Sequence, residues 1–357
     1  MRKSTRGMTR LTIGLDLGDR FSCFCVLDAK GSIVEEDRVA TTPAGFRRRF
    51  GGRRPAVIAI EAGAHSPWVN RLLAELGHEV LVANPSRLRL IYENRSKSDR
   101  VDARSLARLA RADRNLLSPI QHRSQQAQQD QALLRSRDAL VRTRTVLINH
   151  VRGIVKGFGL RIPRVNTIGF HKRATPELLG DLHETLTPVL DTIGAITAQI
   201  RALDKRLEDI SQLVYPETQL LRQVPGVGPL VALAFVLSIE DPDRFAKSRT
   251  LGPFLGLVPR RDQSGNSDPE RRITKQGDSY VRRLLVQAAH YILGPFGPDT
   301  DLRRYGSRIA ARGGKNAKKR AVIAVARKLA VLLHRLWKTA EVYEPLRATA
   351  KGQKTAA

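Results

Sequence analysis

The sequence predicts a mixed α/β domain at the N-terminal end and mostly α-helical, partly coiled-coil regions after it. Short apolar runs alternate with turn signals over residues 11–82, whereas later apolar residues recur every three or four positions. With 357 residues, the chain is long enough for two or three domains with a sizeable core. We expect an α/β domain at 1–118, a helical, coiled-coil region at 119–217, a helical domain at 218–345 and a disordered basic tail at 346–357.

The first 83 residues give the order βββαβαβ, beginning with an antiparallel hairpin. Each apolar run is bounded by glycine, proline or polar residues, which is typical of strands joined by short turns. A further helix begins at Asp99. The predicted strands are Leu11–Leu15, Phe21–Leu27, Ile33–Val39, Ala56–Ile60 and Glu79–Ala83, and the predicted helices are a basic one opened by Thr42 and Pro43 and a second at Pro67–Leu76.

The rest of the chain reads as helices. Residues 125–156 form one long helical pattern that ends near Gly157. Residues 182–214 carry a sustained heptad of apolar residues, which predicts a helical hairpin or an intermolecular coiled coil, with an ordinary bundle helix equally compatible. Residues 218–344 give a last helical domain, and the final RATAKGQKTAA has the composition of a disordered tail.

Composition points to a polyanionic partner. The net charge of +28 and the isoelectric point near 11.1 favour nucleic acid. No apolar run approaches the ~20 residues of a membrane span, and Asp16 interrupts the first apolar segment, so we expect neither a membrane nor a signal peptide. Cys23 and Cys25 suit reduced thiols packed in the core of a cytoplasmic protein. Aromatic residues make up 5% of the chain, which argues against broad base-stacking platforms.

Four acidic residues form the candidate metal site. Asp99 and Asp102 share a helix face with Leu106 and Ala110, so both are expected on the core side, where an uncompensated carboxylate is costly. The other two, Asp16 and Glu61, end predicted strands and are soon followed by glycine. Such a set would repel itself unless cations lay among its members, and Mg²⁺ prefers oxygen ligands. Taken singly, each acid is more simply a turn or cap residue, as Asp99 would be in a capping box with Ser96.

These motifs carry a family resemblance. GLDLGD, IEAG and KSDRVDARSLARL resemble the DEDD motifs of a RuvC-like domain with an RNase H fold. More specifically, they resemble insertion-sequence transposases related to the Piv DNA invertase, which are bridge-RNA-guided recombinases. The resemblance implies that Asp16, Glu61, Asp99 and Asp102 are catalytic and hold Mg²⁺, with Mn²⁺ as a substitute.

Two motifs in the second half extend the resemblance. The stretch VPGVG has the form of a helix-hairpin-helix turn, in which Gly226 and Gly228 let backbone N–H groups approach a phosphate, although a plain connection between helices is equally compatible. Further on, a Ser-Gly pair precedes the basic segment ITKQG. Taken alone this pair is a turn, but the resemblance implies that Ser264 is a nucleophile, with Ser267 as its rival because Gln263 stands where the family often has a serine. Cations that can stabilise the developing charge are Arg260, Arg261, Arg271, Arg272 and Lys275.

The last basic segment is a second candidate nucleic-acid surface. From Leu302 to Lys338 there are twelve Lys or Arg residues and no acid, which a solvated charged face does not explain. A helix with a basic start follows Gly313 and Gly314, contrary to the helix dipole, and a bound phosphate would offset that penalty. The residues expected to contact phosphates there are Lys315, Lys318, Lys319 and Arg320.

The sequence therefore predicts a DNA recombinase with a composite active site. The resemblance implies donor and target DNA, a structured guide RNA and a covalent phosphoserine link. Because recombination exchanges at least two strands, we expect a homo-oligomer (dimer or tetramer), with the 182–214 heptad as its dimerisation element. We expect the protein in the bacterial cytoplasm, at the nucleoid. Two other classes remain open. The protein could be a RuvC-like junction-resolving endonuclease that uses the acids without serine chemistry, or a scaffold that binds nucleic acid without catalysis.

Overall fold

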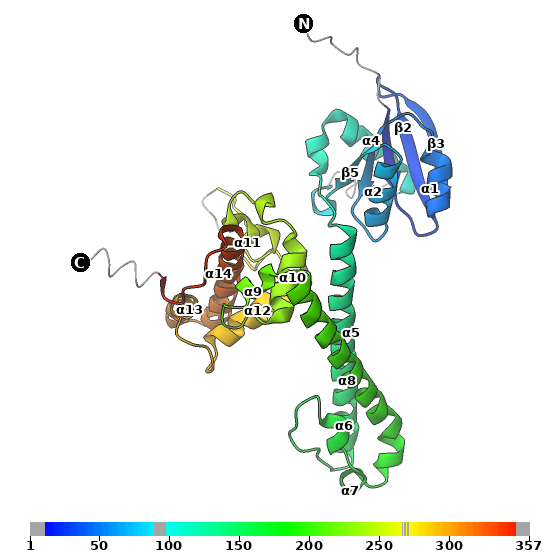
Figure 1. Cartoon of the computed structure of the whole chain (residues 1–357). Coiled ribbons are helices and arrows are strands. Elements are labelled where there is room, and N and C mark those ends of the chain that lie inside the picture. The colour runs from blue at the N-terminus through cyan, green and yellow to red at the C-terminus, as the bar shows by residue number, and fades with distance from the viewer. Residues whose placement is uncertain (1–10, 89–97, 266, 268, 270, 348–357) are drawn as a thin grey trace, which may run out of the picture. The chain divides into compact units, whose positions relative to one another are not determined.

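A computed structural model describes residues 11–88, 98–265, 267, 269 and 271–347 (Figure 1). The predicted disordered tail lies outside the described residues from position 348 onward. The chain divides into two compact units, residues 1–122 and 123–357, and each is described by itself below.

The first unit is built on one mixed five-stranded sheet. Its strand order is β3-β2-β1-β4-β5, with β2 antiparallel to both of its neighbours and β1, β4 and β5 mutually parallel. The predicted order βββαβαβ followed by a helix is confirmed. The strands are β1 (Thr12–Asp16), β2 (Phe21–Leu27), β3 (Ile33–Ala40), β4 (Val57–Glu61) and β5 (Glu79–Ala83).

Helices cover both faces of this sheet. Ile13, Leu15 and Ile60 pack on one face in a single apolar cluster with side chains of α1 (Pro43–Phe50) and α2 (Ser66–Glu75). The opposite face receives α4 (Asp99–Ala112). This helix comes so close to β1 that a Cβ on Gly14 would lie 2.0 Å from the carbonyl oxygen of Ala103. Short 3₁₀ turns at Pro85–Arg87 and Arg114–Leu117 flank α4 in the chain.

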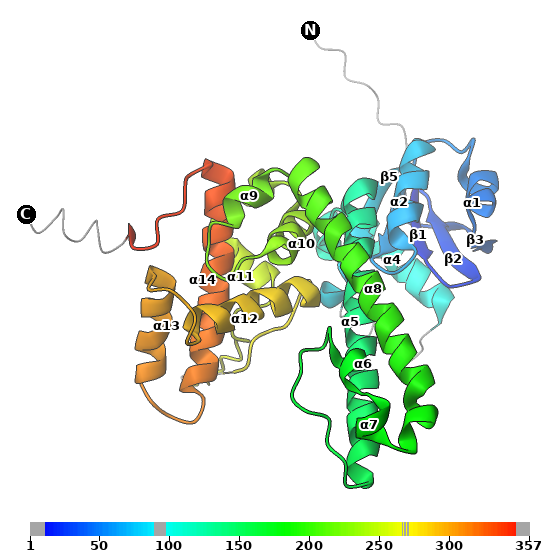
Figure 2. The same cartoon turned by 60° about the horizontal axis from the view of Figure 1, so that its bottom comes forward.

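In the second unit, two long helices pair along their length. The helices α5 (Gln125–Gly157) and α8 (Leu182–Leu213) are antiparallel, since Arg137 pairs with Asp204 whereas Arg144, two turns later, donates a hydrogen bond to Thr197 (Figures 1 and 2). The predicted heptad thus forms a hairpin within the chain. Its buried positions on α8 are Leu186, Leu190, Ile193, Thr197, Ile200, Leu207 and Ser211, and the short helices α6 (Phe170–Arg173) and α7 (Pro176–Leu179) pack at its far end.

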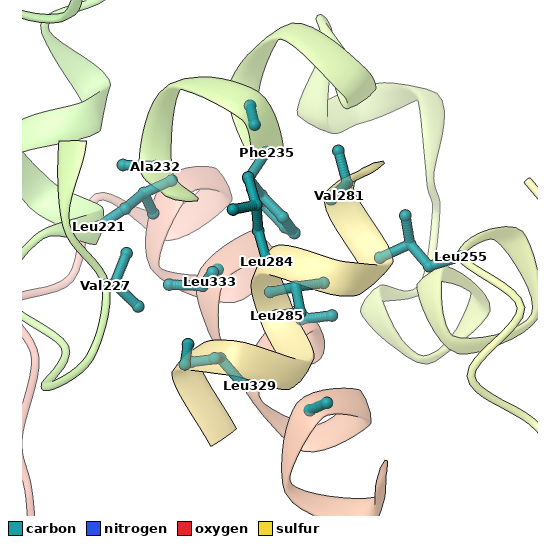
Figure 3. Packing of buried hydrophobic residues seen from close by; sticks show 14 of the residues in the cluster. Leu221, Val227, Ala232, Phe235, Leu255, Val281, Leu284, Leu285, Leu329 and Leu333 are labelled. Atoms are coloured by element: carbon teal, nitrogen blue, oxygen red, sulfur yellow. The ribbon is translucent and has the colours of Figure 1, made fainter. Parts of the chain in front are cut away.

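The remaining helices share one hydrophobic core, as predicted for a helical region after residue 218. Leu221, Phe235, Leu285 and Leu333 meet there from four different helices (Figure 3). Leu207 of α8 belongs to the same cluster. None of the helices in the described ranges is long and apolar enough to cross a membrane. The core-forming elements are α9 (Glu217–Leu221), α10 (Pro229–Ile239), α11 (Leu251–Phe254), α12 (Ser279–Leu293), α13 (Asp301–Ala311) and α14 (Ala317–Thr339).

Candidate active site and nucleic-acid interface

Asp16 and Glu61 end two neighbouring parallel strands at the same edge of the sheet. The register pairs Leu15 of β1 with Ile60 of β4, so the next residue of each strand is one of these acids. Side chains alternate between the two faces of a strand. Since Gly14 meets α4 and Ala59 shares an apolar cluster with it, both acids project from the face that α4 covers.

The start of α4 lies at this same edge. Cys23 faces Asp16 across the β1–β2 pair. Burial raises the pKa of the Cys23 thiol, and the negative charges of Asp99 and Asp16 raise it further. The structure thus brings Asp16, Glu61 and the first turn of α4, with Asp99 and Asp102, to one side of the sheet. We call these four residues the acidic edge.

The burial of the two acids on α4 differs from expectation. Asp102 is half-buried, but Asp99 is exposed, so the prediction that both lie on the core side is wrong for Asp99. The first buried residue of α4 is Ala103, one turn after the helix begins, and Asp99 precedes this buried stretch. Ser98 caps the helix by accepting from the N–H of Val101, and Ser96 lies outside the described residues. Carboxylates in this first turn interact favourably with the helix dipole.

Two arginines of α4 hold the helix against the edge of the first unit. Arg104 forms a two-pronged ion pair with Glu36 of β3, and Arg111 donates to the carbonyl oxygen of Ala29. Cys25 is buried as predicted, whereas Cys23 is only half-buried, and both thiols are free. These contacts fix α4, and with it two of the four acids, relative to the strands.

Two further residues, which the sequence did not single out, follow the strands that end in Asp16 and Glu61. His65 follows β4 and Asp19 follows β1, and their side chains lie 3.7 Å apart. His65 also accepts a hydrogen bond at Nδ1 from the indole of Trp68. The only signal in the sequence was that each residue stands three or four positions after a strand-terminal acid.

The carboxylate oxygens of the acidic edge suit a hard divalent cation, but they do not lie close enough together to form a metal site. Carboxylate oxygens are the ligands that Mg²⁺ and Mn²⁺ prefer. Within the part of the chain that the structure describes, no three His, Cys, Asp or Glu side chains come close enough together to hold a metal ion. Cation binding would therefore have to draw the carboxylates of the acidic edge closer together.

Ser264 lies at the tip of an exposed arm in the second unit, which we call the serine arm (residues 258–275). Pro259 and Ile273 pair near its base. At the tip, Ser264 and Ser267 exchange backbone hydrogen bonds of 3.1 and 3.0 Å around a tight turn in which Gly265 has φ +54°. Both serines are exposed. Ser264 and its rival Ser267 thus lie side by side, and both are accessible to a nucleic-acid strand.

The base of the serine arm is held tightly. A Cβ on Gly277, where φ is +72°, would lie 2.0 Å from the carbonyl oxygen of Phe254. Arg282 donates from Nη1 to the carbonyl oxygens of Leu255 and Gln276 at 3.0 and 2.7 Å. The five cations predicted to assist the serine are all exposed on the arm, namely Arg260, Arg261, Arg271, Arg272 and Lys275. Arg271 forms an ion pair with Asp262 at 3.0 Å.

The VPGVG segment forms the tight turn between α9 and α10. Gly226 has φ +84°, and Gly228 is the N-cap of α10, so the cap residue offers no side-chain acceptor to the backbone N–H groups of the first helical turn. A cavity of about 440 Å³ opens beside this turn. Its polar lining comes from Arg222, Gln287 and Tyr291, three residues that the sequence did not indicate.

A second helical hairpin, α13 and α14, carries the basic segment. Its turn contains Gly313 and Gly314 at φ +75° and +87°, and the first turn of α14 holds no acid. The cations predicted to contact phosphates there are all exposed, namely Lys315, Lys318, Lys319 and Arg320.

Comparison with known proteins places these features in a family. Residues 13–159 match a DEDD-type transposase model of the IS110 group, and residues 218–301 match the model described as "Transposase IS116/IS110/IS902 family". The chain is 29% identical to the transposase for insertion sequence element IS1111A of Coxiella burnetii over 96% of this chain and 94% of that relative. It is 31% identical to a probable family 20 transposase of Pseudomonas aeruginosa, covering 93% of this chain and 98% of the relative.

A more distant relative acts in gene inversion. The pilin gene-inverting protein of Moraxella bovis is 25% identical over 71% of this chain and 70% of its own length. Together with the mixed sheet, its strand-end acids and the helical second unit, these matches define a DNA transposase, an enzyme class that binds, cuts and rejoins DNA. The chain belongs to the IS116/IS110/IS902 family of insertion-sequence transposases.

Proposed function

We propose that this transposase joins DNA strands through a composite site in which the acidic edge and Ser264 act together. The observation that carries the proposal is the convergence of two strand-end acids with the acidic first turn of α4. The sheet has the strand order β3-β2-β1-β4-β5. Strand β2 is antiparallel to β1, whereas β1, β4 and β5 are parallel to one another. This arrangement supports an RNase H-like, RuvC-like fold for the first unit.

The acidic edge would hold one or two divalent cations, Mg²⁺ or Mn²⁺. Asp16, Glu61, Asp99 and Asp102 supply the oxygen ligands, and a bound cation would stabilise charge developing on the oxygens of a phosphodiester. The residues themselves set the geometry, because Asp16 and Glu61 stand on paired strands and Asp102 on a helix that packs against them. Arg104, paired with Glu36, keeps that helix in place.

Ser264 would be the nucleophile. Its Oγ forms a bond to the phosphorus of a DNA strand while the bond from phosphorus to the leaving deoxyribose oxygen breaks. The serine proton departs, and the leaving oxygen takes up a proton. The phosphoserine link keeps the strand activated until the hydroxyl of a second strand attacks the phosphorus and releases Ser264. The arginines of the serine arm, which are exposed, would stabilise the charge on the phosphate.

The partners follow from the same proposal. Donor and target DNA would contact the VPGVG turn and the basic start of α14, and a structured guide RNA would read the sequence by base pairing. Guide-RNA use rests on the resemblance to bridge-RNA-guided recombinases, with the high positive charge as support. Exchange of two strands needs more than one active site, so we propose a dimer or tetramer.

One observation favours a second candidate. All four acids belong to the first unit, whereas Ser264 belongs to the second. A RuvC-like junction-resolving endonuclease would need the acids alone, with water in place of the serine hydroxyl. In that case, replacing Ser264 would leave cleavage intact.

The deciding experiment uses full-length protein co-expressed with the DNA that flanks its gene. Donor and target duplexes are supplied with Mg²⁺, and joined strands are measured for the wild type, Ser264→Ala, Ser267→Ala and Asp102→Asn. Loss of joining in Ser264→Ala and Asp102→Asn, with Ser267→Ala active, supports the composite site. Cleavage that survives Ser264→Ala contradicts it and supports the endonuclease. A parallel sample treated with ribonuclease tests the guide RNA, since joining that persists unchanged would contradict its role.

A further inference from the structure

Phe296 is the most exposed large hydrophobic residue in the described part of the chain, with 83% of its surface accessible. It lies between α12 and α13 in the sequence Gly-Pro-Phe-Gly-Pro. The N–H of Gly297 donates to the carbonyl oxygen of Gly294 at 3.2 Å, which closes a β-turn with Pro295 at its second position and Phe296 at its third. The turn thus displays the ring toward solvent.

This turn is rigidly built. Arg303 of α13 donates from Nη1 to two carbonyl oxygens of the turn, those of Gly294 and Gly297 at 2.6 and 2.9 Å, and to that of Ile292 in α12 at 2.8 Å. A Cβ on Gly297 would lie 2.3 Å from the carbonyl oxygen of Ile292, so only glycine fits there. Proline fixes one dihedral angle of the turn in addition. The Phe296 ring is exposed to solvent on a turn with this many constraints, so it is pre-organised for contact with a binding partner.

The turn adjoins the cavity beside VPGVG. The backbone of Tyr291 borders the turn, since its carbonyl oxygen lies 2.7 Å from the Cβ position of Gly297. The ring of Tyr291, 47% exposed, lines the cavity and reaches to 3.1 Å from the Cβ position of Gly226. Tyr291 therefore links the exposed Phe296 turn to the uncapped start of α10.

The chemistry of this corner fits one kind of ligand. The first turn of α10 offers backbone N–H groups to a phosphate, Gln287 offers an amide with both donor and acceptor atoms, and two aromatic rings offer stacking surfaces. Asp299, the acid nearest to Phe296 in the sequence, forms an ion pair with Arg304 at 2.6 Å. An anion is therefore not repelled from the turn.

We propose that Phe296 and Tyr291 form a stacking site for an unpaired nucleobase of a strand whose phosphate binds at the start of α10. The inference rests on the proposed function, because a recombinase must act on strands that are locally unpaired. It also accords with the low aromatic content of the chain, since a stacking site for one base uses two rings and no extended aromatic surface.

The test measures binding of the full-length protein to two matched probes, a blunt DNA duplex and the same duplex with a three-nucleotide overhang that contains 2-aminopurine. The wild type is expected to quench the 2-aminopurine and to bind the overhang probe about 10-fold more tightly. Phe296→Ala should lose this preference and most of the quenching while binding the blunt duplex unchanged. Phe296→Trp should retain both. RNA versions of the probes show whether the base belongs to DNA or RNA.

A matched control is available on the α5–α8 hairpin. Phe158 is 67% exposed, and Phe158→Ala removes an equal ring without touching the proposed corner, so its preference should equal that of the wild type. An unchanged preference in Phe296→Ala overturns the stacking site and leaves the proposed function standing. Equal losses on both probes, or a change of oligomeric state without nucleic acid, also overturn it. A wild type that binds neither probe contradicts both proposals.

Discussion

The acidic edge and the serine arm are built in opposite ways. Asp16 and Glu61 end paired strands, and Asp102 stands on a helix so close to the sheet that only glycine fits beneath it at position 14. Ser264, in contrast, lies at the tip of a tight turn where a Cβ on Gly265 would have no neighbour within 4 Å. The acids stand on packed strands and a packed helix, with side chains from half-buried to exposed, whereas the serine is displayed in solvent on a turn.

This difference matches what each feature has to do in the proposed reaction. Carboxylates that share a cation must hold their spacing against mutual repulsion, which requires rigid elements. A nucleophilic serine that bonds to one DNA strand and later releases it to a second strand must protrude from the protein surface. The serine arm combines an exposed tip with a tightly packed base, so the base fixes the place from which the tip extends into solvent.

The largest effect is expected for the acidic edge. Asp102→Asn or Glu61→Gln should lower strand joining at least about 1,000-fold, since each removes a charge that would hold the cation. In a thermal unfolding assay without nucleic acid, Mg²⁺ or Mn²⁺ should raise the Tm of the wild type but not of these variants. Without metal, the unfolding free energy of each variant should stay within about 1 kcal/mol of the wild type, because the loss of one like charge offsets the loss of favourable contacts such as that of Asp102 with the helix dipole.

Glu75→Gln on α2 is the matched control. Glu75 forms an exposed pair with Arg47 at 3.2 Å, far in sequence from the four acids, and such pairs contribute little to stability. Its metal response and joining rate should equal those of the wild type. A wild type whose Tm ignores both metals would contradict the metal site whatever the activity shows.

The base and the tip of the serine arm should differ in their tolerance of a methyl group. Gly277→Ala places a Cβ against the Phe254 carbonyl at a positive φ and should lower the free energy of unfolding by about 3 kcal/mol. Gly265→Ala has the same backbone strain in open space and should cost about 1 kcal/mol. Equal losses in urea denaturation would mean that the base is no more constrained than the tip.

The pH dependence of stability probes the packing behind the acidic edge. Burial, helped by a hydrogen bond to Glu36, raises the pKa of the Cys25 thiol from 9.0 to about 11. The thiol stays protonated in the folded chain at pH values where it ionises in the unfolded chain. Its contribution to stability is therefore complete below pH 9 and is lost between about pH 9 and 11, by about 2 kcal/mol.

Cys25→Ala should flatten that part of the pH profile. The quantity to compare is the slope of unfolding free energy against pH, measured in denaturant, because the substitution also changes packing. Identical slopes in the two proteins would show that Cys25 is more open to water than the structure indicates.

The smallest effect is expected at the basic start of α14. Replacing Lys318, Lys319 and Arg320 by Gln together should weaken DNA binding about 10-fold at physiological salt and reduce the salt dependence of log K by about 2 to 3. The same charge change on α8, at Arg201, Lys205 and Arg206, serves as the control. Equal effects of the two triple variants would mean that net charge, rather than this helix start, determines binding.

Much of the first unit could be predicted because its strands carry local signals. The predicted limits of β2 and β5 agree with the structure, since turn residues bound each apolar run. The exposure of Asp99 could not be predicted, because it depends on where α4 first touches the sheet. The pairing of His65 with Asp19 likewise depends on two loops that meet only after folding.

The second unit shows the same limit more sharply. Periodicity predicts that residues 182–214 are helical, but the choice of α5 as partner depends on contacts such as Arg137 with Asp204. The display of Phe296 was not predicted, because it depends on a guanidinium that comes from the next helix. Local patterns predict elements, and the contacts between elements decide which side chains are displayed.

The most direct test of the composite site is a search for a covalent protein–DNA adduct. Full-length protein is incubated with donor and target duplexes and Mg²⁺, and the products are separated on a denaturing protein gel beside Ser264→Ala and Asp102→Asn. The composite site predicts an adduct in the wild type that is absent from both variants. Nicked DNA without any adduct, formed equally by Ser264→Ala, would contradict the serine mechanism and leave the acids acting alone.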